Sequence, residues 1–144
     1  MIEKVIENWH RQIRGEFPGG LDELLADDVV FYSPIVFSPQ EGKEITKLYL
    51  NAAGATLGGE GSKGVSGAAA GKSTFRYTKE VLSGNHAVLE FEATSEGKYI
   101  NGVDIITCNA EGKITEFKVM IRPLQAVNLL HQQMAAMLKK MQSQ

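Results

Sequence analysis

The sequence predicts a single α+β domain in which helices are segregated from an antiparallel sheet. Two observations lead to this class. Helical periodicity is confined to residues 2–57 and to the C-terminus, and four strand-like runs between them follow one another with only short turns. The length of 144 residues is usual for one domain, and no internal repeat divides it. We therefore expect one domain over 1–144.

Three helices are predicted in the first part of the chain. Apolar residues from Ile2 to Ile13 recur at helical spacing, which indicates an amphipathic helix that ends at the glycines and proline of 15–20. Leucines at 21, 24 and 25 predict a short second helix that ends near residues 27–28. The pattern between 41 and about 57 predicts the third.

The first strand is predicted at 29–32, where β-branched and aromatic residues precede Ser33-Pro34. Residues 35–37 are expected to continue it after a kink. The following stretch, 58–72, is rich in Gly, Ala and Ser, and it is expected to be a flexible loop because it has almost no large apolar side chain to bury.

The second half of the chain predicts a meander that is followed by a helix. Strand-like runs cover about 74–82, 86–95, 99–109 and 113–122. Short turns that contain glycine or asparagine separate them, which favours antiparallel hairpins. Apolar residues then recur every three or four positions from Leu124 to Met141, which predicts a C-terminal amphipathic helix.

The composition excludes several function classes. A net charge of −2 gives no attraction to nucleic acid or to an anionic membrane surface, so neither partner is expected. No apolar run reaches the roughly 20 residues of a membrane span. Cys108 is the only cysteine, so an intrachain disulfide is impossible and a reducing cytoplasm is the expected location.

The strand at 99–109 differs from its neighbours because it is apolar on both faces. The strand at 86–95 alternates apolar and polar residues, as expected of a sheet with one face in water. In 99–109, Val103 and Ile105 share one face, while Ile100 and Ile106 share the other. We expect helices to cover one face and a partner subunit to cover the other, which predicts a homodimer.

Asp104 lies in line with the apolar residues of that strand. A carboxyl group is costly to bury, so it needs a partner or becomes neutral through a raised pKa. This makes Asp104 the first candidate for a functional site. A structural aspartate bonded to Tyr, Arg or backbone, or one at an exposed sheet edge, explains the same pattern.

Three segments resemble the nuclear transport factor 2-like superfamily, and its SnoaL-like and ketosteroid isomerase branches in particular. They are Leu-Ala-Asp-Asp-Val-Val-Phe-Tyr-Ser-Pro at 25–34, Gly-Val-Asp-Ile-Ile at 102–106 and Ala-Glu-Gly-Lys-Ile-Thr-Glu-Phe at 110–117. The resemblance implies a cone-shaped fold, with a curved, mixed but mainly antiparallel sheet around an apolar pocket. It also implies a small, mostly apolar ligand and frequent dimers.

The resemblance also assigns roles to individual residues. The acid that binds the developing oxyanion in the isomerases falls on Asp104, their base falls on Ser33, and their oxyanion-binding tyrosine falls on Trp9. A serine hydroxyl cannot replace a carboxylate base at neutral pH. A conventional isomerase mechanism is therefore not expected.

Asp104 and Tyr32 are the candidate catalytic residues. The expected ligand-binding residues are aromatic or polar groups near the implied pocket: Trp9, Ser33, Tyr49, Tyr77, Phe91, Ile106 and Arg122. No metal or cofactor is expected. The three histidines have no metal-ligand spacing, and the glycine-rich segment before Lys72 has Ser66 where a phosphate loop needs glycine.

Two functions remain open. The first is an isomerase or cyclase-like lyase that acts on a small carbonyl compound. The second is a non-catalytic ligand-binding or oligomeric assembly domain on the same fold.

Overall fold

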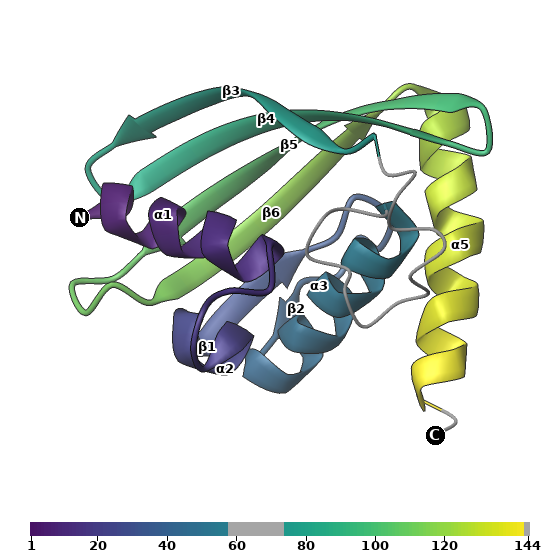
Figure 1. Cartoon of the computed structure of the whole chain (residues 1–144). Coiled ribbons are helices and arrows are strands. Elements are labelled where there is room, and N and C mark those ends of the chain that lie inside the picture. The colour runs from purple at the N-terminus through teal and green to yellow at the C-terminus, as the bar shows by residue number, and fades with distance from the viewer. Residues whose placement is uncertain (58–73, 143–144) are drawn as a thin grey trace.

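A computed structural model of the chain describes residues 1–57 and 74–142, so the loop expected at 58–72 lies outside the described part. Within it, helices lie against one face of a six-stranded sheet (Figure 1). The helices are α1 Ile2–Ile13, α2 Gly20–Leu24, α3 Lys43–Leu57 and α5 Leu124–Gln142. The strands are β1 Leu25–Tyr32, β2 Gln40–Glu41, β3 Arg76–Ser83, β4 His86–Ser95, β5 Lys98–Cys108 and β6 Ile114–Arg122.

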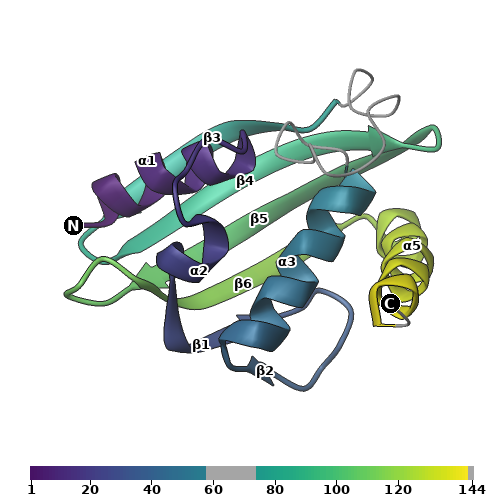
Figure 2. The same ribbon diagram turned by 60° about the horizontal axis from the view of Figure 1, so that its bottom comes forward.

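The sheet has the order β2-β1-β6-β5-β4-β3. Strands β3 to β6 form the predicted antiparallel meander, whereas β1 runs parallel to β6. The predicted α+β class with a mixed, mainly antiparallel sheet is therefore confirmed. Figure 2 shows α1 over β3 and β4, with α2 and α3 on the same side of the sheet.

The second predicted helix is shorter than expected. It ends at Leu24, and Leu25 already has the extended backbone of β1, where it pairs with Ile114 of β6. The expectation that the helix reaches residues 27–28 was wrong. Leu25 and Ala26 are buried in this strand, so sheet pairing outweighs the helical spacing of the leucines.

The expectation that residues 35–37 continue the first strand was also wrong. The Ser33 hydroxyl accepts hydrogen bonds from the backbone N–H groups of Ile35 and Val36, at 3.0 and 3.2 Å, and so turns the chain. Phe37 is fully exposed as a result. The chain pairs with β1 again only at β2, where Gln40 lies opposite Phe31.

The described core consists of two apolar clusters on the helix side of the sheet. The larger one joins the buried face of α1 to the inner residues of β1, β4, β5 and β6. The smaller one joins Phe91, Ala93 and Ile100 of the sheet to Ala126 and Leu130 of α5. No helix of the described residues is long and apolar enough to cross a membrane.

Candidate functional site

Asp104 lies in the middle of β5 and on the helix side of the sheet. Its neighbours across the ladder are Leu89 of β4 and Val119 of β6. Its residue surface is only 6% exposed. A carboxyl group is therefore held in an apolar setting, where it needs a hydrogen-bonding partner.

That partner is Tyr77 of β3, which belongs to a buried chain of hydrogen bonds. The Tyr77 hydroxyl donates to Asp104 Oδ2 at 2.6 Å. The Trp9 indole Nε1–H of α1 donates to Tyr77 Oη at 2.9 Å. Trp9, Tyr77 and Asp104 are far apart in sequence, and they meet because α1 packs across β3 and β4 (Figures 1 and 2).

The electrostatics of this chain favour a neutral carboxyl group. Burial raises the pKa of Asp104 to about 7, and the hydrogen bond from Tyr77 opposes this rise only in part. Burial also raises the pKa of Tyr77 well above its usual value, with a further contribution from the nearby Asp104 charge. The site can therefore hold or release one proton near neutral pH.

Aromatic rings surround the hydrogen-bonded chain. The ring of Phe75 lies 5.1 Å from that of Tyr77 and 5.0 Å from that of Phe91, between centroids. The ring of Phe117 lies 4.9 Å from that of Trp9. Tyr77 packs against both apolar clusters, so the polar chain lies where the two clusters meet.

Gly102 leaves space on the sheet for the Phe91 ring. A Cβ atom at position 102 would lie 2.6 Å from Phe91 Cζ and 2.7 Å from the backbone oxygen of Met120. Such distances are far inside van der Waals contact. The rings of Phe75, Tyr77 and Phe91 form an aromatic wall beside Asp104. This wall therefore depends on a residue without a side chain at position 102.

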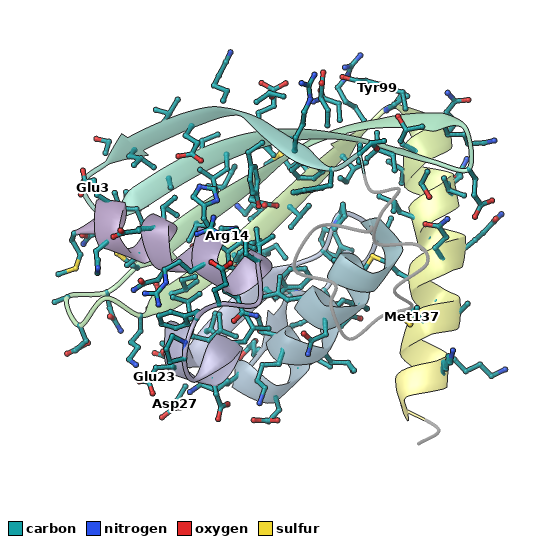
Figure 3. The ribbon with its side chains drawn as sticks, in the orientation of Figure 1. Glu3, Arg14, Glu23, Asp27, Tyr99 and Met137 are labelled. Carbon is teal, nitrogen blue, oxygen red and sulfur yellow. The ribbon has the colours of Figure 1, made fainter. Side chains whose placement is uncertain are left out.

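A pocket of about 220 Å³ opens between α1 and the start of β3. Its lining residues are His10, Ile13, Arg14, Phe75, Arg76 and Tyr77. Figure 3 labels Arg14 at the C-terminal end of α1. Tyr77, the middle member of the buried hydrogen-bonded chain, therefore also lines this cavity.

No family model matches the sequence, and the search of curated proteins found no match. Among solved structures, a steroid delta-isomerase from Pseudomonas aeruginosa is similar over 99% of this chain and 94% of that chain, with a TM-score of 0.83 and 26% identity. An NTF2-like protein of unknown function from Mesorhizobium loti has a TM-score of 0.59 and 14% identity, and covers 84% of this chain and 90% of its own.

A putative polyketide cyclase from Sinorhizobium meliloti has a TM-score of 0.56 and 12% identity, and the match covers 81% of this chain and 94% of that chain. The chain has the fold of the nuclear transport factor 2-like proteins. Trp9 and Asp104 are linked through Tyr77, which the family pattern did not assign.

Ser33, at the position of the isomerase base, has its hydroxyl group turned to the backbone of residues 35 and 36. Tyr49 packs on Phe31, with 5.4 Å between the ring centroids. Ile106 is fully buried in the larger cluster, whereas Phe91 belongs to the aromatic wall. Phe91 meets the Tyr77 ring edge-on, with 6.2 Å between the ring centroids.

Tyr32 and Arg122 lie on the opposite face of the sheet. Tyr32 pairs with Lys118, and the Lys118 ammonium lies 4.9 Å from the centre of the Tyr32 ring. Arg122 pairs with Asn101 and donates to its side-chain oxygen at 3.2 Å. The expected roles of Tyr32 and Arg122 beside Asp104 therefore find no support in this geometry.

Two residues near Tyr77, His10 and Glu80, were not among the sequence-based candidates. His10 Nε2 lies 2.5 Å from Glu80 Oε2, and the His10 ring meets the Tyr77 ring edge-on, with 5.4 Å between centroids. A bulge between Tyr77 and Lys79 places Glu80 on the same face as Tyr77. In the described part of the chain, no group of three or more His, Cys, Asp or Glu residues is arranged to hold a metal ion.

Proposed function

We propose that this protein binds a small, mostly apolar molecule through one oxygen atom, which accepts a hydrogen bond from Tyr77. The observation that carries this proposal is the buried chain from Trp9 through Tyr77 to Asp104, located where two apolar clusters meet and where Tyr77 lines a pocket. Apolar walls with a few fixed polar groups are typical of small-molecule sites.

The direction of the hydrogen bonds depends on the proton of Asp104. When Asp104 is ionised, Tyr77 gives its single hydroxyl proton to the carboxylate and has none for a ligand. When Asp104 is protonated, it donates to Tyr77 Oη, as Trp9 does, and the Tyr77 hydrogen can turn to the ligand. The two donors then strengthen the Tyr77 hydrogen bond through cooperative polarisation.

Such a donor also suits catalysis. When a proton leaves the carbon beside a carbonyl group, negative charge develops on the carbonyl oxygen, and a fixed donor in a dry site stabilises that charge. Isomerase or cyclase-like chemistry on a small carbonyl compound fits this arrangement. The similarity to the steroid delta-isomerase, over nearly the whole of both chains, supports the same class of reaction.

The proposal is tested by calorimetric titration with a naphthol, whose phenolic oxygen and fused rings imitate an enolate in an apolar site. We expect the wild type to bind and Tyr77→Phe to bind at least about tenfold more weakly, because the ligand oxygen loses its donor. Tyr99→Phe is the matched control, since Tyr99 is bonded to Glu92 on the outer side of the sheet (Figure 3). Equal affinity of Tyr77→Phe and the wild type would contradict the proposal.

A second proposal concerns assembly, and it rests on the outer face of the sheet. Val81, Val88 and Ile105 lie side by side on adjacent strands, and Val103 pairs with Met120 in the next row. Val81 is 54% exposed and Met120 is 51% exposed in the single chain. We propose that a second copy of this chain covers these residues in a homodimer.

A further inference from the structure

His10, which lines the pocket, belongs to a second polar pair that the proposed function does not use. His10 comes from α1 and Glu80 from β3, and their side chains meet at 2.5 Å between Nε2 and Oε2. The His10 side chain is 27% exposed and that of Glu80 is 37% exposed, so the pair is open to solvent, and His10 lines the pocket. An imidazole oriented by a carboxylate is the arrangement of a general base and its positioning group.

We propose that His10 is the general base of this site and that Glu80 positions its imidazole. This proposal rests on the proposed function, because it takes the Tyr77 hydroxyl as the donor to the carbonyl oxygen. It also explains how the site works without a carboxylate base, since Ser33 at that position is bonded to the backbone and has no basic group. His10 replaces that base from another element, α1.

The geometry places the base beside the proposed oxygen site. The His10 ring meets the edge of the Tyr77 ring, with 5.4 Å between centroids, and both residues line the same pocket. A ligand in this pocket therefore lies beside both side chains, and the proposal places its carbonyl oxygen at Tyr77 and the neighbouring carbon at His10.

The protons balance without any further reagent. In the neutral imidazole, Nε2–H donates to Glu80 and leaves a lone pair on Nδ1. In the described residues, we find no hydrogen bond to Nδ1. Nδ1 takes the proton from the carbon, the electron pair of that C–H bond forms a carbon–carbon double bond, and the carbonyl π pair moves onto the oxygen that Tyr77 bonds. Return of the proton to another carbon completes an isomerisation.

The test measures exchange of the carbon-bound protons of β-tetralone for deuterium, by NMR in deuterated water. This bicyclic ketone has acidic C–H bonds next to its carbonyl group. We expect the wild type to accelerate the exchange and His10→Ala to lose at least about a hundredfold in rate. Added free imidazole should restore part of the His10→Ala rate, which a purely structural role of His10 cannot explain. Glu80→Gln should lower the rate with unchanged KM.

His86→Ala is the matched control, because His86 lies at the β3–β4 turn and contacts Thr107. It should exchange at the wild-type rate. Naphthol affinity separates this inference from the proposed function: His10→Ala should lose much less of it than Tyr77→Phe, which removes the donor to the ligand oxygen. A wild type that binds naphthol but does not accelerate exchange, or a His10→Ala variant that exchanges as fast as the wild type, would overturn the role of His10.

Discussion

One buried residue, Asp104, makes the free energy of unfolding depend on pH. Its pKa is raised from an ordinary value of 3.8 to about 7 in the folded chain, mainly because it is buried. Between these two values the unfolded chain loses the proton and the folded chain retains it. The free energy of unfolding therefore falls as pH rises through this window, by up to roughly 4 kcal/mol.

We expect Asp104→Asn to remove this decline, because the amide imitates the neutral acid and does not ionise. The measurement is denaturant unfolding at about pH 5 and about pH 8, for both proteins. Asp28→Asn, at an exposed position of β1, should retain the wild-type decline. Equal pH dependence in the wild type and Asp104→Asn would mean that the carboxyl group is not held in a dry site.

The candidate site was only partly predictable at this scale. An aspartate in line with apolar strand residues indicates a buried carboxyl group, and Asp104 follows that pattern. Its partner Tyr77 was only one of several tyrosines expected at the pocket. Their contact depends on the packing of β3 beside β4 and on the bulge after Tyr77, and no periodicity in the sequence indicates that bulge.

At the scale of elements, helices and strands with a regular apolar spacing were predictable from the sequence, whereas irregular boundaries between elements were not. Strand β4 has the predicted bounds, and α1 ends at Ile13 as its apolar spacing indicates. The boundary between α2 and β1 was wrong because Leu25 satisfies both a helical pattern and a strand pattern. Only the parallel pairing with β6, which involves residues some ninety positions away, decides between them.

The C-terminal helix α5 allows a test of what stabilises an element. Leu130 is 2% exposed and packs with Ile100 and Phe91 in the smaller cluster, whereas Leu124 is 73% exposed. We expect Leu130→Ala to lower the free energy of unfolding by roughly 2–5 kcal/mol, because it leaves a cavity. Leu124→Ala, the same change in the same helix, should stay within about 0.5 kcal/mol of the wild type.

Denaturant unfolding followed by circular dichroism measures both variants. If Leu124→Ala lowered the free energy of unfolding as much as Leu130→Ala, α5 would depend on contacts other than the packing of Leu130 in the smaller cluster. The comparison also bears on the site, because the smaller cluster contains Phe91 of the aromatic wall.

At the scale of the whole molecule, the two faces of the sheet differ in whether helices cover them. The inner face is covered by α1 to α3 and reached by α5, and the candidate site lies there (Figure 2). The outer face has no helix over it in the described part of the chain, yet it has an apolar centre. Polar groups such as Glu90 and Lys118 surround that centre, in the manner of a protein interface with an apolar core and a polar rim.

We therefore expect the wild type to have twice the chain mass in solution. Val81 and Val88 are paired across β3 and β4 on the outer face, so replacing both by lysine places two charges in the proposed interface. Those charges lose water on assembly without gaining partners, which should convert the dimer to a monomer. Sedimentation equilibrium measures this directly.

Val36→Lys is the control for the added charge, because Val36 is 38% exposed and lies in the turn after Ser33, away from the sheet. It should remain dimeric. The double variant should still bind a naphthol, since the hydrogen-bonded chain faces the opposite side of the sheet. A monomeric wild type, or a double variant that remains dimeric, would mean that the outer valines are not the contact between subunits.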